Sequence, residues 1–364
     1  MKKIEAQHID DLALGSVFLA TGGGGDPYLP QQIAKKVLES CGPVQTILPQ
    51  DLDDGAYVVP IGGVGAPTVS LELLPSLDEA AKTLEAFEEH VGKRVDAVAS
   101  FEIGGGNSLV PLVAAAMRGI PVVDGDGMGR AFPEAQMMTY AIGGVKPTPA
   151  LARDYAGNTA VFSTTSTEVY EYHIRSFAAA AGGMITVAEH PMSGAELKRA
   201  VIPGTLSFTV KLGETLRKHR GPAADILEPL KAVFDGSIYG ECRCLFTGKV
   251  TDKSTRIIGG YDIGVATLED FDDPDLRLQL DIKNEYLLAR IGERVVASVP
   301  DLIVTVDFET STPINCERLR FGQRVAVFAV GCPDFYRTPA ALAVTSPRNF
   351  GFDIDYVPLE QLPG

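Results

Sequence analysis

The sequence predicts an α/β protein: an amino-terminal domain built on a parallel sheet, followed by a carboxy-terminal β-rich domain with some helices. Two patterns carry this prediction. Apolar strands and amphipathic helices alternate with short links over residues 57–123, which is typical of a parallel sheet with right-handed crossovers. Short alternating strands separated by glycine turns occupy residues 238–330, which is typical of an antiparallel sheet. The 364 residues are enough for two domains with buried cores.

The amino-terminal half begins with two predicted helices. Residues 9–20 carry apolar side chains at helical spacing, and Asp10 or Asp11 can cap the first turn. A second helix over residues 29–40 ends before a Gly-Pro pair. The alternation then begins, with strands predicted at 57–61, 95–99 and 120–123 and helices at 77–91, at 108–118 and after Pro133.

The pattern changes after residue 149. One more strand is predicted at 159–162, and helices are predicted at 168–181, 204–220 and 223–234. Alternating strands follow, for example at 243–250, 276–280 and 325–330. We therefore expect an α/β glycine-loop domain over residues 1–165 and a mixed helical and β-rich domain over residues 166–364. Within the second domain, a barrel or sandwich is expected at about 238–330.

Composition restricts the partners and the location. The formal net charge is −15, and an acidic surface repels both nucleic acid and anionic membranes, so we expect neither as a partner. The first residues are charged and lack the apolar core of a signal peptide. No apolar run approaches the roughly 20 residues that span a bilayer. Five scattered cysteines do not form a disulfide framework. A cytoplasmic location is therefore expected.

Four glycine-rich segments in the first 130 residues each follow an apolar segment. They cover residues 21–27, 62–67, 101–107 and 124–130. Glycine adopts backbone angles that other residues avoid, and it lets the main chain approach a ligand closely. The last three segments follow predicted strands, and ligands of parallel sheets bind beyond the carboxyl ends of the strands. We therefore expect these three loops to meet at one edge of the sheet.

A phosphate site is the usual meaning of such loops, because the amino terminus of a helix attracts anions. No glycine loop here is followed by the Lys-Ser or Lys-Thr of the Walker pattern. The segment from Gly104 to Asn107 lacks the third glycine of a dinucleotide fingerprint. A nucleotide- or cofactor-dependent enzyme that uses the glycine loops therefore stays as an alternative without a proper fingerprint.

Carboxylates are the stronger indication of chemistry. Glu102, Asp124 and Asp126 lie at neighbouring strand ends, and Glu134 follows shortly after Arg130. Close carboxylates repel each other, so at least one should have a raised pKa or bind a cation. Such groups act as general acid and base or hold a divalent metal, for which Asp124 and Asp126 are the candidate ligands. The alternative is that these acids only cap helices or stabilise glycine turns.

At these loops the chain resembles the S-methyl-thiohydantoin desulfurase family. The resemblance is carried by residues 20–27, 101–107, 123–134 and 203–207, and it covers nearly the whole chain. It implies an amino-terminal α/β domain followed by a β-rich domain. It also implies an enzyme that replaces the sulfur of a thiohydantoin-type ring by oxygen, leaving a hydantoin for a hydantoinase to open. The implied substrate is a small cyclic amide or thioamide.

The candidate residues fit this reaction. A carboxylate at a strand end can deprotonate the attacking water, and loop amides can stabilise charge on sulfur. We expect Glu102 or Asp126 to be the base, with Asp124 as a further catalytic candidate. Arg130 is expected to orient an acidic substituent of the ring. The other substrate-binding candidates are Gly23, Gly24, Gly25, Asp26, Gly105, Gly106, Asn107 and Glu134.

A non-catalytic protein is the remaining alternative. A ligand-binding subunit of hydantoin metabolism would bind its ligand tightly without turnover, although a sensor of a neutral ligand has no need of clustered acids. A homodimer is also allowed, because apolar stretches in the β-rich region could form the two-fold interface that is commonest in oligomers.

Overall fold

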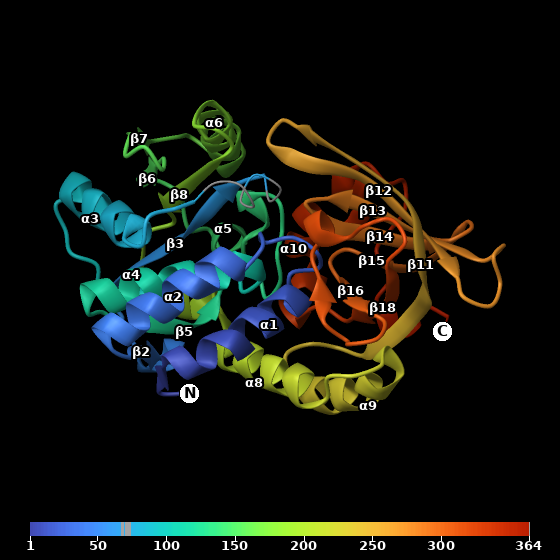
Figure 1. Ribbon diagram of the computed structural model, residues 1–364. Coiled ribbons are helices and arrows are strands. Elements are labelled where there is room, and N and C mark those ends of the chain that lie inside the picture. The colour runs from blue at the N-terminus through green and yellow to red at the C-terminus, as the bar shows by residue number, and fades with distance from the viewer. Residues whose placement is uncertain (67–68, 70–73, 364) are drawn as a thin grey trace.

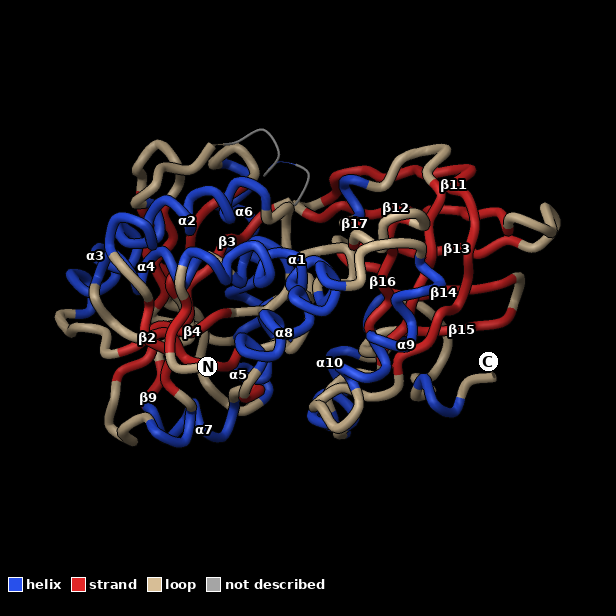
Figure 2. The backbone as a smooth tube through the Cα atoms, turned by 60° about the horizontal axis from the view of Figure 1, so that its bottom comes forward, coloured by secondary structure: helices blue, strands red, loops and turns tan. Residues whose placement is uncertain are grey.

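Two sheets organise the molecule. The computed structural model describes residues 1–66, 69 and 74–363. Within these residues the amino-terminal half holds a ten-stranded sheet and the carboxy-terminal half an eight-stranded sheet. Figure 1 shows the two halves side by side, and Figure 2 shows that helices gather in the first half while strands dominate the second. The predicted α/β class with a β-rich carboxy-terminal half is confirmed.

The first sheet has a parallel centre and antiparallel outer strands. Its order is β1-β2-β5-β4-β3-β8-β6-β7, and β9 and β10 pair with β3 and β5. Strands β2, β5, β4 and β3 are parallel, whereas β8 pairs antiparallel with β3. The sheet is therefore mixed around the predicted parallel core. The strands are β1 Lys3–Ile4, β2 Val44–Ile47, β3 Tyr57–Gly65, β4 Ala97–Ser100, β5 Val122–Asp126, β6 Ala150–Arg153, β7 Thr159–Phe162, β8 Met184–Ala188, β9 Met192–Ser193 and β10 Ile202–Pro203.

Two strands continue into segments that were expected to be loops. Residues 62–65 belong to β3 and form the part of this strand that pairs with β8. Glycine is needed there because a Cβ on Gly62 would overlap the ring of Phe101. Pro67, the last residue of that predicted loop, lies outside the described residues. β5 likewise continues to Asp126, so both of its aspartates are strand residues.

The helices cover the first sheet and join the two halves. α4 packs on β4 between α2 and α3, α6 packs on β3, and α8 packs on β5 and against α1. None of the described helices is long and apolar enough to cross a membrane. The helices are α1 Ile9–Leu19, α2 Tyr28–Cys41, α3 Glu79–Val91, α4 Val110–Arg118, α5 Thr139–Ile142, α6 Thr167–Ala180, α7 Gly194–Ala200, α8 Thr205–Lys218, α9 Ala223–Phe234 and α10 Pro339–Thr345.

The second sheet is antiparallel throughout. Its order is β15-β14-β13-β12-β11-β18-β16-β17. The long β11–β12 hairpin reaches over toward α6 of the amino-terminal half (Figure 1). The strands are β11 Cys242–Ile258, β12 Tyr261–Asp270, β13 Arg277–Lys283, β14 Glu285–Ile291, β15 Arg294–Ser298, β16 Leu302–Asp307, β17 Pro313–Ile314 and β18 Arg324–Val330.

Strand β18 is buried on both faces and belongs to two hydrophobic cores. Ala326, Phe328 and Val330 lie in a core that extends through the amino-terminal sheet and its helices. Val325, Val327 and Ala329 lie in the second core, inside the carboxy-terminal half. This division follows from the alternation of side chains along a strand. The first core therefore includes residues from both halves of the chain.

Candidate active site

Two of the glycine loops, the first at residues 21–27 and the second at residues 101–107, pack directly against each other. The Gly106 amide donates to the Gly25 carbonyl oxygen at 3.0 Å. A Cβ on Gly24 would overlap the Gly104 carbonyl oxygen, and a Cβ on Gly105 would overlap the Gly24 backbone. Glycine is therefore required at these positions by the contact between the loops themselves. The close approach expected toward a ligand is in part an approach of one loop to the other.

The first glycine loop is also bonded to the carboxy-terminal half. The Tyr286 amide donates to the Thr21 carbonyl oxygen at 2.7 Å, and the Cys316 amide donates to the Gly22 carbonyl oxygen at 2.8 Å. A Cβ on Gly23 would overlap the carboxyl group of Glu285. The absence of a side chain at position 23 thus leaves room for an acid from β14 beside the two loops.

A cavity of about 140 Å³ lies beside these loops. Its lining includes polar residues of the glycine loop at residues 101–107, of α6 and of the β13–β14 turn, and apolar residues of α2 and α4. A smaller cavity of about 40 Å³ adjoins it and shares Glu102, Asn107 and Arg175 with it. The polar residues of the larger cavity include Asp26, Glu79, Glu102, Asn107, Tyr155, Arg175, Thr186, Asn284 and Glu285.

Glu102 faces both cavities and is held by two donors. Asn107 Nδ2 donates to Glu102 Oε1 at 2.6 Å, and the Phe132 amide donates to Oε2 at 3.3 Å. The side chain is 6% exposed. Burial raises the pKa of Glu102 to about 8, although the hydrogen bonds from Asn107 and Phe132 lower it. A carboxyl group with such a pKa can accept or donate a proton near neutral pH.

Asn107 holds Glu102 against β3. Its Oδ1 accepts from the Gly63 amide at 2.6 Å, and its Nδ2 donates to the Gly63 carbonyl oxygen at 3.1 Å as well as to Glu102. The predicted ligand-binding residue Asn107 therefore lines the cavity, but its amide group is engaged with protein atoms. In this arrangement it positions a carboxylate.

Glu285 is a second buried carboxyl group at the same cavity. It is 2% exposed, and its Oε2 has no hydrogen-bond partner among the described residues. Burial and the nearby Glu102 raise the pKa of Glu285 well above its ordinary value, while Arg130 and Arg175 oppose the shift. Two hydrogen bonds lower the pKa of Glu102, whereas the pKa of Glu285 is lowered by the two arginines and by its own backbone amide, so the two acids have different environments.

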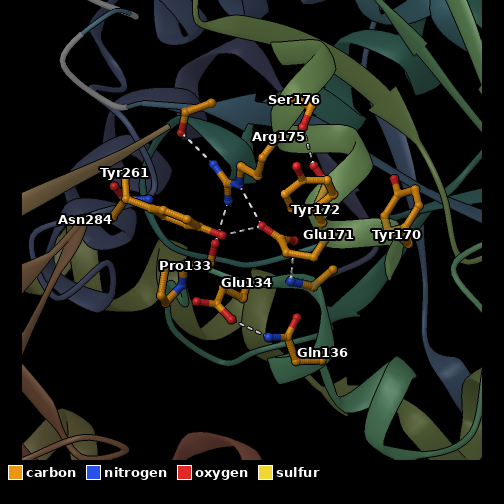
Figure 3. Close-up of polar contacts among 12 residues, drawn as sticks. Pro133, Glu134, Gln136, Tyr170, Glu171, Tyr172, Arg175, Ser176, Tyr261 and Asn284 are labelled. Atoms are coloured by element: carbon orange, nitrogen blue, oxygen red, sulfur yellow. Dashed lines mark hydrogen bonds and ion pairs between the residues drawn. The ribbon is translucent and has the colours of Figure 1, made fainter. Parts of the chain in front are cut away.

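Arg175 is the cation at this cavity, and its guanidinium is fixed on three sides (Figure 3). Its Nε donates to Glu171 at 2.7 Å, its Nη1 to the Gly65 carbonyl oxygen at 3.0 Å and its Nη2 to the Pro133 carbonyl oxygen at 2.5 Å. Burial opposes its charged form, but Glu171 and Tyr261 outweigh burial and raise the pKa of Arg175. Arg175 thus keeps its charge beside the two acids.

Tyr261 and Glu134 connect the two halves beside Arg175 (Figure 3). The Tyr261 hydroxyl, at the start of β12, donates to Glu171 at 2.7 Å, and the Arg175 guanidinium lies 4.6 Å from the centre of its ring. Glu134 lines the smaller cavity and is paired with Lys283 and Gln136. The candidate Glu134 therefore lies near the site, with its carboxylate neutralised by a lysine.

Asp126 is buried beside the same loops, outside the lining of the cavity. Its Oδ2 accepts from the amides of Ile103, Met128 and Gly129 at 2.8, 3.0 and 2.8 Å. Burial raises the pKa of Asp126 to about 6, against the effect of these bonds. Asp126 therefore ties the glycine loop at residues 101–107 to the one at residues 124–130, and its side chain is not part of the cavity lining.

Asp124 and Arg130 also lie apart from the cavity. Asp124 accepts from the Ser207 amide at 3.0 Å and from the Ser207 hydroxyl, so it binds the first turn of α8. Arg130 is fully buried and donates to the carbonyl oxygens of Pro300 and Asp301 and to the Thr21 hydroxyl. Its donors are therefore used within the protein, between the first glycine loop and the second half.

The other candidates lie at the edge of the cavity. Asp26 accepts from the Tyr28 amide at 2.8 Å and pairs with Arg318 at 2.5 Å. Gly24, Gly25 and Gly106 line the cavity, whereas Gly23 and Gly105 lie behind it against Glu285 and Gly24. The amides of Gly24 and Gly25 donate no hydrogen bond to any described residue. Because both glycines line the cavity, their amides are candidate donors to a ligand.

The candidate metal ligands are not gathered into a group. Asp124 and Asp126 are both hydrogen-bonded as described, and within residues 1–66, 69 and 74–363 no three histidine, cysteine or acidic side chains are placed to hold a metal ion. The metal requirement stays a prediction from the sequence.

Sequence reasoning missed Glu285, Arg175 and Asn284. All three come from beyond residue 165 and reach the cavity through tertiary contacts. One local signal was available: Asn284 is the single residue between β13 and β14, and it adopts a positive φ of 59°. Asparagine tolerates this left-handed backbone better than most residues and favours turns, so the residue type at position 284 is consistent with a tight turn before Glu285.

Fold and site together define a two-part α/β protein with a pair of buried carboxyl groups in a cavity between glycine loops. The chain matches the S-Me-THD-like N-terminal domain over residues 7–164 and the S-Me-THD-like C-terminal domain over residues 165–359. It therefore belongs to the S-Me-THD-like family, as the resemblance of its glycine loops to the S-methyl-thiohydantoin desulfurase family predicted.

The fold has been seen in a solved structure. The crystal structure of a protein from Chromobacterium violaceum matches this one with a TM-score of 0.78. The two sequences are 24% identical, and the match covers 99% of this chain and 100% of the other. At this identity the likeness concerns the fold alone. No curated protein matches the sequence.

Proposed function

We propose that this protein hydrolyses the carbon–sulfur bond of an S-methyl-thiohydantoin-type ring and releases a hydantoin. The observation that carries the proposal is the pair Glu102 and Glu285, two buried carboxyl groups at one cavity. Membership of the S-Me-THD-like family supports the substrate class. The cavity of about 140 Å³ supports a small ring, since a cavity of about 150 Å³ is large enough for benzene.

Glu102 is the base in this proposal. Asn107 and the Phe132 amide donate to its two oxygens and so favour the carboxylate form. Glu285 is the acid, because one of its oxygens has no partner among the described residues and burial favours its neutral form. Two carboxyl groups whose environments differ in this way divide the roles of base and acid between them.

The proton transfers balance with these two groups. Water adds to the ring carbon that carries sulfur, and one of its protons passes to Glu102. The electron pair of the C=N bond moves to the ring nitrogen, which takes the proton of Glu285. The new hydroxyl group then returns a proton to Glu285 as the C=O bond forms. The C–S bond breaks, and the leaving thiolate takes the proton from Glu102 to give methanethiol.

Charge on the reacting ring is stabilised by groups that are already in place. Gly24 and Gly25 line the cavity, and their amides have no acceptor among the described residues. We assign them as donors to the ring, because fixed donors stabilise developing negative charge. The Arg175 guanidinium adds a positive charge that is held rigidly by its three acceptors. These groups are proposed to lower the barrier for attack and for departure of the thiolate.

The test is the turnover of S-methyl-thiohydantoins by Glu102→Gln and Glu285→Gln, measured as release of thiol and of hydantoin. We expect either change to reduce kcat by about a hundredfold or more, because each removes a positioned proton carrier. Glu309→Gln, at a side chain that is 61% exposed, is the matched control and should keep full activity. Near-normal turnover by folded Glu102→Gln protein would exclude this base.

A further inference from the structure

Glu102 faces two cavities of very different size. The larger one, of about 140 Å³, and the smaller one, of about 40 Å³, both have Glu102 and Arg175 in their lining. Among the described lining residues, Ala135 and Glu189 belong to the smaller cavity alone, whereas Glu285 belongs to the larger one alone. The carboxyl group proposed as the base therefore faces a second space, which the proposed acid does not line.

The sizes of the two cavities fit different molecules. A cavity of about 150 Å³ holds benzene, so a small ring fits the larger cavity and is too large for the smaller one. One buried water molecule needs at least about 10–15 Å³. The smaller cavity therefore has room for one or a few water molecules beside Glu102, but not for the ring.

Glu102 and Arg175 can both bind such a water molecule. One donor contacts each oxygen of Glu102, and a carboxylate has about four acceptor positions, so it can accept further hydrogen bonds. The Nε–H of Arg175 and one N–H of each Nη donate to Glu171, Gly65 and Pro133. The second N–H of each Nη has no acceptor among the described residues. The smaller cavity is thus lined by both an acceptor and a donor for water.

Glu189 is a second acceptor in the smaller cavity. Its side chain is 1% exposed, its Oε2 accepts from the Tyr170 hydroxyl, and its Oε1 lies 3.2 Å from Nδ1 of His190. Each oxygen can therefore accept a further hydrogen bond. A buried water typically makes about three hydrogen bonds, and Glu102, Glu189 and Arg175 together provide the groups for them.

We propose that the smaller cavity binds the attacking water while the larger cavity binds the ring, and that Glu102 takes its proton from the water in the smaller cavity. This inference rests on the proposed function and locates the nucleophile of that reaction. A water held in this way is already beside its base when the ring binds. Precise placement of reacting groups supplies much of the rate of an enzyme.

Two variants separate the two cavities. Ala135→Val enlarges a side chain of the smaller cavity, and Ala80→Val enlarges one of the larger cavity to the same extent. Both alanines are 5% exposed in the native protein. We expect Ala135→Val to reduce kcat for an S-methyl-thiohydantoin by about tenfold or more, because a misplacement of about 1 Å can cost a hundredfold, and to leave the Kd of the product hydantoin within about twofold. Ala80→Val should instead raise this Kd severalfold, measured by calorimetry.

A crystal structure of the native protein with a bound hydantoin is a second test, which needs no variant. We expect the ring in the larger cavity and an ordered water in the smaller one, within hydrogen-bond distance of Glu102. Density without this water, or full kcat in folded Ala135→Val protein, would overturn the water site while leaving the desulfurase function standing. An ordered water that Ala135→Val displaces, together with no turnover of any thiohydantoin, would overturn the function and show that the smaller cavity still binds water.

Discussion

Glu102 and Asp126 show how hydrogen bonds divide the roles of two neighbouring buried acids. Three backbone amides converge on one oxygen of Asp126 and make it part of the loop framework. Glu102 has two donors, and its carboxyl group faces the cavity. Burial raises the pKa of Asp126 to about 6 and that of Glu102 to about 8. The acid that faces the cavity therefore also has the higher pKa.

The raised pKa of Glu102 predicts how stability depends on pH. Its folded pKa of about 8 exceeds the ordinary glutamate value, so between about pH 5 and 8 the folded state binds more protons than the unfolded state. The free energy of unfolding should therefore fall as the pH rises through this window, by at most about 1.4 kcal/mol per pH unit for this group.

Denaturant unfolding of the native protein and of Glu102→Gln across this window measures the effect. The variant lacks the titrating group, so its free energy of unfolding should fall less steeply with pH than that of the native protein. Part of the slope will remain, because Glu285 also has a raised pKa. Parallel curves for the two proteins would show that Glu102 does not titrate in this range.

At the scale of elements, the glycine loops act first as packing surfaces. Gly24, Gly104 and Gly105 touch backbone to backbone, with no space for a side chain between the loops. This contact holds Glu102 on one loop and Gly24 and Gly25 on the other loop beside the same cavity. Precise positioning of groups in this way supplies much of the advantage of an active site.

Two glycines provide a matched test of this packing. Gly105 has a φ of 63° and is crowded by Gly24, whereas Gly119 has a φ of 68° with no atom within 4 Å of an added Cβ. Gly119→Ala should cost about 1 kcal/mol of stability, the penalty for a left-handed alanine. Gly105→Ala should cost about 3 kcal/mol or more, because the loops must also separate.

Thermal or denaturant unfolding of the two variants gives the difference directly, and turnover of the folded Gly105→Ala protein reports on the site. Equal losses of stability would mean that the loops separate easily and that crowding at Gly105 is unimportant.

The alternation of elements and the presence of a glycine-framed cavity could be predicted from the sequence. That glycine is required where two of the loops pack against each other could not be predicted. Apolar periodicity indicated the central strands, because buried strands need continuous apolar residues. The strand predicted from this periodicity ended at residue 61, whereas β3 continues to Gly65. Glycine weakens the apolar pattern of a strand, even at positions where close neighbours require glycine. Residues 62–65 are a strand because β8, which lies far along the chain, pairs with them.

At the scale of the whole molecule, the shared core means that the folded structure of each half is stabilised by the other half. β18 contributes Ala326, Phe328 and Val330 to the core of the amino-terminal sheet. The first glycine loop is bonded to Tyr286 and Cys316 of the second half. Glu285 and Arg175 could not be found by local patterns, because only this assembly of the chain brings them to Glu102.

This shared core predicts that the two sheets unfold together. Amide hydrogen exchange of β4, in the first sheet, and of β18, in the second, should report the same free energy of opening within about 1 kcal/mol, because residues protected only by global unfolding share its free energy. A β18 that opens at a clearly lower free energy than β4 would show two separate folding units.

The contact between Gly23 and Glu285 also predicts that these two distant positions covary in evolution. A larger residue at position 23 would displace the acid, and a change of acid would leave the space above the glycine unfilled. A change of side-chain size at one of these positions is therefore expected to require a change at the other.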